Sequence, residues 1–223
     1  MPAFRAILAA AVLAGLAAAQ QGVSFPTEDK GLIFADLYGA GGRAVVLAHG
    51  GRFNRESWNP QAKILAAAGL RVLAIDFRGE GQSRGGNDGR PQDEHRHLDV
   101  LGAVRYLRKT GARSVSVVGA SMGGDYAAEA AEAEPAQIDR LVLLASGAYN
   151  PLLHMKGRKL FILARDDAND DGPRLPRIQE QFRKALEPKQ LIILDGSAHA
   201  QFLFQTDQGE RVMQEILKFL LAP

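Results

Sequence analysis

Short apolar runs that alternate with helical patterns constrain the fold of this chain more than any other feature of its sequence. Strands that are covered on both faces have this composition, and parallel sheets are covered in this way. The alternation predicts an α/β fold with a mostly parallel central sheet and helices on both faces. The predicted strands lie at residues 45–48, 72–75, 114–118, 141–144, 160–163 and 191–194, and the predicted helices at about 56–68, 93–109, 122–133, 177–186 and 208–221.

The segment upstream of the first run predicts an antiparallel edge. Residues 31–37 (GLIFADL) alternate imperfectly and end in a glycine-rich turn at 39–42. A strand follows directly, so we expect the two strands to pair as a hairpin. In the last helix, Asp207 and Glu210 have the spacing of a capping pair. No repeat, linker or charge block interrupts residues 20–223, which predicts a single domain.

Residues 1–19 have the pattern of a secretory signal peptide. Arg5 is the only charged residue among the first 27, and residues 6–19 are all apolar or glycine. This run is shorter than the roughly 20 residues that span a bilayer, and it ends in small residues that suit cleavage. We therefore expect a periplasmic or extracellular protein with no stable membrane insertion after cleavage. An alanine-rich helix packed on the domain is the alternative.

Composition excludes several kinds of partner and chemistry. Lys and Arg number 27 against 25 Asp and Glu, so the formal net charge is +2 and no nucleic-acid partner is expected. The chain has no cysteine. That absence removes thiolate nucleophiles, thiolate metal sites and thiol redox chemistry.

Glycines and polar residues follow the predicted strands at the position where α/β sheets bind ligands. The carboxyl ends of parallel strands meet at one edge of the sheet, so we expect a serine, acids and a histidine to lie on that edge. The segments, in chain order, are His49-Gly50-Gly51, 76–83 (DFRGEGQS), 119–124 (GASMGG), Arg165-Asp166-Asp167 and 195–199 (DGSAH).

Ser121 is the strongest candidate for a nucleophile. Residues 119–123 (GASMG) fit G-x-S-x-G and stand between a predicted strand and a predicted helix. Small residues on either side let the strand and helix approach, and the serine Oγ then projects above the sheet at a helix N-terminus. One alternative is a serine that only caps the helix. Another is a phosphate-binding loop, but Asp125-Tyr126 stand where that loop needs Lys-Ser/Thr.

A serine nucleophile needs a base that is held by an acid. Of the five histidines, only His199 follows the last predicted strand in a loop of Gly, Ser and Ala, so it is the predicted base. Asp166 and Asp167 compete for the role of the acid. His154 follows the fourth run and is a candidate for a residue that borders the site.

The loop of these acids also permits a calcium hypothesis. Asp167, Asn169, Asp171 and Gly172 match the first positions of an EF-hand loop, but Ile178 stands where the last ligand should be Glu. Two prolines also interrupt the loop. We therefore predict neither a metal site nor a cofactor.

These motifs together resemble the α/β-hydrolase superfamily over nearly all of the chain after the leader. The matching features are His49-Gly50, D-x-R-G-x-G-x-S at 76–83, G-x-S-x-G-G at 119–124 and the order Ser, Asp, His. The resemblance implies that Asp167, three residues after Ala164, is the acid in preference to Asp166. It also implies that the backbone N–H groups of Met122 and Gly51 form an oxyanion hole, with Arg52 as an alternative second donor.

The chain departs from lidded members of this superfamily. Only residues 145–158 separate the fourth predicted strand from the fifth, which leaves no room for a cap domain and predicts an open site. The chain looks most like small lidless members, such as dienelactone-hydrolase-like enzymes and esterases. Many of those carry a cysteine nucleophile, whereas this chain has Ser121.

The predicted function is that of a secreted serine hydrolase that cleaves small-molecule esters or thioesters through an acyl-enzyme. Alternatives are a non-catalytic binding protein with this fold, and cofactor-free perhydrolase or lyase chemistry on the same residues. Arg52 and His154 are the candidate substrate-binding residues. An acidic substrate is a further hypothesis, because four arginines follow strand ends: Arg52, Arg55, Arg78 and Arg165.

Overall fold

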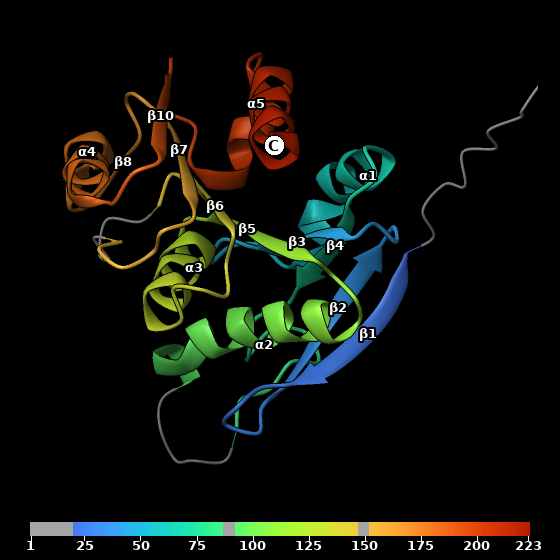
Figure 1. Ribbon diagram of the computed structural model, residues 1–223. Coiled ribbons are helices and arrows are strands. Elements are labelled where there is room, and N and C mark those ends of the chain that lie inside the picture. The colour runs from blue at the N-terminus through green and yellow to red at the C-terminus, as the bar shows by residue number, and fades with distance from the viewer. Residues whose placement is uncertain (1–19, 87–91, 147–151) are drawn as a thin grey trace, which may run out of the picture.

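The computed structural model describes residues 20–86, 92–146 and 152–223. Its centre is a twisted sheet of eight strands, flanked by helices on both faces (Figure 1). The order across the sheet is β1-β2-β4-β3-β5-β6-β7-β10. The strands are β1 (Gln21–Pro26), β2 (Leu32–Tyr38), β3 (Arg43–Ala48), β4 (Arg71–Ile75), β5 (Ser114–Ala120), β6 (Arg140–Leu144), β7 (Arg158–Ala164) and β10 (Lys189–Leu194).

In the sheet order given above, every pair of neighbours from β4 onward (β4-β3-β5-β6-β7-β10) is parallel. Strand β2 pairs antiparallel with both β1 and β4. Two short strands, β8 (Ala168–Asn169) and β9 (Gly172–Pro173), form a separate hairpin. The helices are η1 (Arg55–Trp58), α1 (Asn59–Ala67), η2 (Gln92–His95), α2 (Arg96–Lys109), α3 (Met122–Ala133), α4 (Arg174–Lys184), η3 (Ala200–Gln205) and α5 (Gly209–Leu221).

Alternating side chains of the central strands enter two separate cores. Val46 packs into the core under α2, α3 and α4, whereas its neighbours Val45 and Leu47 pack into the core under α1 and α5. All three are fully buried. A strand with apolar residues on both faces is stable only when both faces are covered. The unbroken apolar runs of the sequence therefore predicted this three-layer arrangement correctly.

The edge of the sheet differs from the sequence-based prediction in one respect. Strand β2 does not pair with β3; it pairs with β1 on one side and with β4 on the other. The reason is that β3, whose residues 44–48 are buried, takes an interior position between β4 and β5. Strand β1 was not predicted, because Phe25 is the one buried residue in its pattern and no apolar run marks it.

The predicted capping pair of the last helix is also wrong. Helix α5 begins at Gly209, and Gln208 is its N-cap, without a side-chain hydrogen bond to the helix. Gly209 fits closely against the chain before it, since an added Cβ would stand 2.4 Å from the backbone oxygen of Phe204. The first residue of the helix thus lies two positions beyond Asp207.

Two features of the carboxyl edge of the sheet favour ligand binding there. Strand β6 ends at Leu144 and β7 begins at Arg158, so the connection is too short for a cap domain. The chain also reverses direction across the sheet at β3, which is followed by β4 on one side and pairs with β5 on the other. Crevices at such reversal points bind ligands in α/β proteins. Within the described residues, no helix has the length and apolarity to cross a membrane.

Candidate active site

Ser121 lies at the tight turn between β5 and α3. Its backbone has φ 48° and ψ −122°, a conformation that is strained for a residue with a side chain. Glycines make the turn possible: an added Cβ on Gly119 would lie 2.5 Å from the Cα of Gly124, and one on Gly123 would lie 2.4 Å from the carbonyl oxygen of Ala48. The Ser121 amide donates a hydrogen bond to the Leu144 carbonyl at 2.9 Å, which fixes the turn to the neighbouring strand.

Three of the predicted residues meet at the carboxyl edge of the sheet. The Nε2 atom of His199 lies 2.8 Å from the Oγ of Ser121, and its Nδ1 lies 2.7 Å from Oδ2 of Asp167. An ionised carboxylate only accepts hydrogen bonds, so Nδ1 carries the ring proton and Nε2 is free to accept the proton of the serine. Asp166 is exposed, while the Asp167 side chain is 1% exposed.

The segment after β3 lies against the serine turn. An added Cβ on Gly51 would lie 3.6 Å from the sulfur of Met122, and one on Gly50 would lie 3.6 Å from the Cβ of Ser121. Among the described residues, the backbone N–H groups of Gly51 and Met122 have no hydrogen-bond acceptor, whereas that of Gly50 donates to Gln201. Two unengaged donors beside a serine can stabilise an oxyanion.

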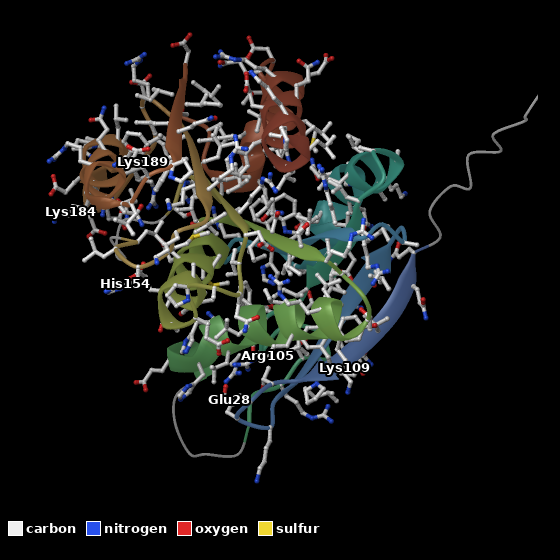
Figure 2. The ribbon with its side chains drawn as sticks, in the orientation of Figure 1. Glu28, Arg105, Lys109, His154, Lys184 and Lys189 are labelled. Carbon is white, nitrogen blue, oxygen red and sulfur yellow. The ribbon has the colours of Figure 1, made fainter. Side chains whose placement is uncertain are left out.

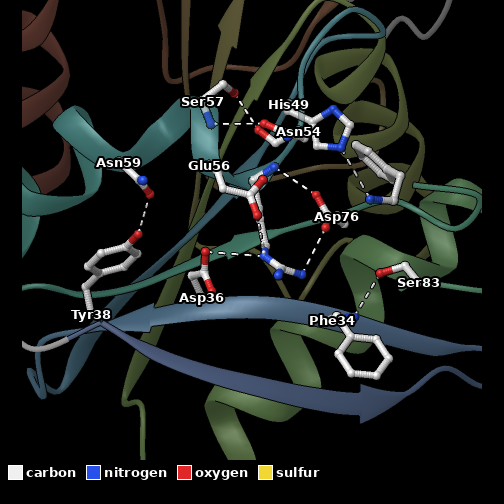
Figure 3. A network of polar contacts seen from close by, with 12 residues as sticks. Phe34, Asp36, Tyr38, His49, Asn54, Glu56, Ser57, Asn59, Asp76 and Ser83 are labelled. Carbon is white, nitrogen blue, oxygen red and sulfur yellow. Dashed lines mark hydrogen bonds and ion pairs between the residues drawn. The ribbon is translucent and has the colours of Figure 1, made fainter. Parts of the chain in front are cut away.

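Polar anchors hold this segment, residues 49–58, in place. Figure 3 shows Asp36 and Asp76 beside it, with His49 at its start. Arg55 is bound to Asp76 through its backbone N–H and its guanidinium, at 2.8 and 2.9 Å, and its Nε pairs with Asp36 at 3.3 Å. Burial raises the pKa of Asp76, and Arg55 opposes that rise. The cation thus allows two buried carboxylates to lie under the segment.

His49 is a structural residue of the same segment. It is fully buried, with Nδ1 2.8 Å from the Gly50 carbonyl and Nε2 facing the backbone N–H of Phe77 at 3.4 Å. The first contact requires a donor and the second an acceptor, so the ring is a neutral tautomer. Burial lowers the pKa of His49, in agreement with this state.

A pocket of about 670 Å³ opens beside the serine. Sequence reasoning missed Arg174, which lies in this pocket at the start of α4. Its Nε pairs with Oδ1 of Asp167 at 3.4 Å, and its backbone N–H donates to the Asp167 carbonyl at 2.9 Å. The lining is largely polar and consists of Ser121, Met122, Asp125, Tyr126, Glu129, Asn169 and Arg174.

Comparison with known proteins identifies the family to which this arrangement belongs. A family model described as the alpha/beta hydrolase fold matches residues 43–216. The chain belongs to the α/β-hydrolase family. Among curated relatives of this α/β-hydrolase, the non-heme chloroperoxidase of Streptomyces lividans is 28% identical over 168 residues, which are 72% of this chain and 52% of that protein. The chain thus spans about half the length of this relative.

Solved structures share the fold of this α/β-hydrolase at low identity. The Pyrococcus furiosus esterase Pf2001 superposes with a TM-score of 0.74 at 18% identity, covering 91% of this chain and 94% of that one. A dienelactone hydrolase from Anabaena variabilis superposes with a TM-score of 0.74 at 22% identity, covering 92% and 98%. These likenesses confirm the predicted fold and the resemblance to small members of the family.

The structure places His154 away from the serine, which contradicts its predicted position beside the site. Its ring lies 2.7 Å from Glu132 near the end of α3, and it lines a surface depression with Ile138 and Asp139, just before β6. Figure 2 shows it on the outside of the molecule. Because β6 and β7 are parallel, their connection must return to the amino edge of the sheet, and His154 lies at the end of that return.

Two of the four arginines at strand ends are likewise not at the mouth of the site. Arg55 is engaged with Asp36 and Asp76 as described above. The Arg78 side chain is 1% exposed and is bound to Asp99 and Asp29 at 2.7 and 2.6 Å. Arg52 and Arg165 are exposed at the carboxyl edge. The positively charged side chains near the site therefore include Arg52, Arg165 and Arg174.

The acidic loop forms the β8–β9 hairpin. Arg177 donates to the side-chain oxygen of Asn169 at 2.8 Å, and the Asn169 amide donates to Asp171 at 3.0 Å. The Asp167 side chain contacts His199 and Arg174 instead. Across residues 20–86, 92–146 and 152–223, no group of three or more His, Cys, Asp or Glu side chains is placed to hold a metal ion.

Proposed function

We propose that this α/β-hydrolase is a serine esterase or thioesterase that acts through an acyl-enzyme. The observation that carries the proposal is the hydrogen-bonded chain from Ser121 through His199 to Asp167. In the first step, the Ser121 oxygen attacks the acyl carbonyl while Nε2 of His199 accepts the serine proton. Asp167 orients the ring and stabilises its charged form.

The oxyanion of the tetrahedral intermediate is assigned to the N–H groups of Gly51 and Met122. As the intermediate collapses, His199 returns the proton to the leaving oxygen or sulfur and the acyl-enzyme forms. Water then attacks the acyl carbonyl, with His199 again as base, and releases the acid and free serine. The proposal needs no cofactor. The open edge above the serine, with no room for a cap domain, favours small or extended acyl compounds.

A fluorophosphonate probe together with a nitrophenyl ester and thioester panel tests this proposal. We expect the wild-type protein to be labelled and to hydrolyse the panel, and Ser121→Ala to lose both properties. Ser197→Ala, an exposed serine two residues before His199, is the matched control and should behave as wild type. Equal labelling of Ser121→Ala would overturn the assignment of the nucleophile. A folded wild type that neither reacts nor turns over would favour a non-catalytic binding protein.

Perhydrolysis is a second candidate, since a curated relative carries the name non-heme chloroperoxidase. In this reaction hydrogen peroxide replaces water as the nucleophile that attacks the acyl-enzyme, which yields a peracid and free serine. Adding peroxide to the ester assay and measuring peracid against free acid distinguishes the two outcomes. A product ratio that favours peracid at millimolar peroxide would assign the second activity.

We further propose that Arg52 recognises an anionic substrate. Arg52 is exposed and follows Gly51 directly. We expect Arg52→Ala to lower kcat/KM for an ester with a terminal carboxylate while leaving a neutral ester of equal length unchanged. Equal rates on both esters, before and after the substitution, would remove this role.

Secretion is proposed from the sequence pattern of residues 1–19, which lie outside the described residues. We propose cleavage after the small residues at 17–19 and a periplasmic or extracellular location. N-terminal sequencing of the mature protein from a fractionated native host tests it. An intact N-terminus in the cytoplasmic fraction would refute it.

A further inference from the structure

Gln201 connects the two halves of the candidate site. It lies in η3, two residues after His199, and is 4% exposed. Its Oε1 accepts a hydrogen bond from the backbone N–H of Gly50 at 2.9 Å, and its Nε2 donates to the Oγ of Ser57 at 2.6 Å. Both partners lie on the segment after β3, more than 140 residues earlier in the chain.

The hydrogen bonds of Gly50 determine where the next peptide group points. Its N–H is bound to Gln201, and its carbonyl accepts from the backbone N–H of Phe53 at 3.0 Å and lies 2.8 Å from Nδ1 of His49. In a trans peptide, the N–H of Gly51 points opposite to the carbonyl of Gly50. The contacts of the Gly50 carbonyl therefore set the direction of the Gly51 N–H, while Gln201 holds the preceding peptide group, which carries the Gly50 N–H.

We propose that Gln201 is a positioning residue, which holds the peptide before the Gly51 donor and so keeps the Gly51 N–H in register with His199. The inference rests on the proposed function. The donor and the base lie on different segments, and the serine turn lies on a third. Gln201 lies on the segment that carries His199, and its side chain is hydrogen-bonded to the segment that carries Gly51. A donor that is even slightly misdirected loses most of its effect on the transition state but little of its effect on substrate binding.

Gln201→Met tests this role, because methionine has similar length and no hydrogen-bond acceptor comparable to the amide. We expect kcat for a nitrophenyl ester to fall roughly 10- to 100-fold, below the loss typical for removal of a whole oxyanion donor, with KM changed less than about threefold. The affinity for a trifluoromethyl ketone, whose adduct places an oxyanion in the same position, should fall by the same factor as kcat/KM.

Gln205→Met is the matched control, since Gln205 is exposed on the same 3-10 helix. It should keep wild-type kcat and ketone affinity. If Gln201→Met does not fold by circular dichroism, Gln201→Asn replaces it; that variant withdraws the amide by one methylene and should show an intermediate loss of kcat.

Two results would overturn the inference: a folded Gln201 variant with kcat within twofold of wild type, or one whose loss is entirely in KM. Ser121→Ala distinguishes this failure from failure of the proposed function. If Ser121→Ala is inactive while Gln201→Met is normal, the nucleophile stands and only the positioning role is lost. If Ser121→Ala keeps full activity, the proposed function itself has failed.

Discussion

The Nε2 atom of His199 lies 2.8 Å from the Oγ of Ser121, although 78 residues of sequence separate them. The parallel sheet explains this proximity, since β5 and β10 both end at the same edge and each is followed by one of the two residues. Asp167 follows β7, which lies beside β10 in the sheet. The rigid layer of strands thus places three loop residues without any of the loops having to be long.

The choice between the two adjacent acids is directly testable. Asp167→Asn should lower kcat roughly 10³- to 10⁴-fold, because the amide no longer holds the required tautomer of His199. Asp166→Asn should change kcat less than twofold, since the Asp166 side chain is exposed and, among the described residues, only its backbone N–H has a partner, the carbonyl of Gly196 at 2.9 Å. Steady-state hydrolysis of one ester by both variants provides the test. A larger loss in Asp166→Asn would reverse the assignment.

The close contact of α3 with β3 predicts that Gly123 tolerates no side chain. An added Cβ would stand 2.4 Å from the Ala48 carbonyl oxygen and 2.5 Å from that of His49. We expect Gly123→Ala to lower the free energy of unfolding by about 3 kcal/mol, as overpacking of a tight contact does. Urea denaturation measures this loss.

Gly22→Ala in β1 is the control for that substitution. Gly22 is exposed, and apart from its own chain neighbours no heavy atom of the described residues lies within 4 Å of its added Cβ. The same change there should alter the free energy of unfolding by less than about 1 kcal/mol. If the two variants were equally stable, close packing would not be the reason for the glycine in the serine turn.

The sequence predicted the fold and the site best where a residue pattern has only one structural explanation. Glycines around Ser121 and apolar runs covered on both sides predicted the serine turn and the layers. It was least informative where a contact depends on how the chain folds back. Arg174 and Gln201 are polar residues in ordinary helical segments, and no local pattern shows that one meets Asp167 and the other Gly50. The predicted place of His154 beside the site was wrong for a related reason: its position depends on the direction of β7 and not on its neighbours in the sequence.

His49 predicts a pH dependence of stability. Burial lowers its pKa in the folded protein below the ordinary value of 6.5. Below about pH 6.5 the unfolded chain therefore binds a proton that the folded protein does not, so the free energy of unfolding falls as the pH falls. The dependence is absent above that pH, where the ring is neutral in both states.

Urea denaturation of wild type and His49→Gln at several pH values tests this prediction. Glutamine does not titrate, so the stability advantage of wild type over the variant should be largest near pH 8 and should shrink steadily between pH 6.5 and 5. The comparison at pH 8 serves as the internal control, because there residue 49 is neutral in both proteins and in both states. A difference that is constant across this range would mean that His49 binds protons equally in the folded and unfolded states.

Arg174 predicts an effect on catalysis through Asp167. The acid is almost fully buried, with one oxygen facing His199 and the other facing the Arg174 guanidinium, which is itself 22% exposed. Without that cation the second oxygen loses its charged partner, and the carboxylate is held less firmly against the imidazole. We expect Arg174→Gln to lower kcat about tenfold, the factor for roughly 1.4 kcal/mol of lost stabilisation.

Arg177→Gln is the control for this effect on the same helix. Arg177 contacts Asn169 and Asp171 but not Asp167, so kcat should stay within twofold of wild type. The split between kcat and KM decides the role of Arg174, since it also lines the pocket beside Ser121. A fall in kcat at constant KM for a neutral ester assigns it to positioning of the acid. A rise in KM alone, confined to carboxylate-bearing esters, would assign it to substrate binding and would refute the predicted effect on Asp167.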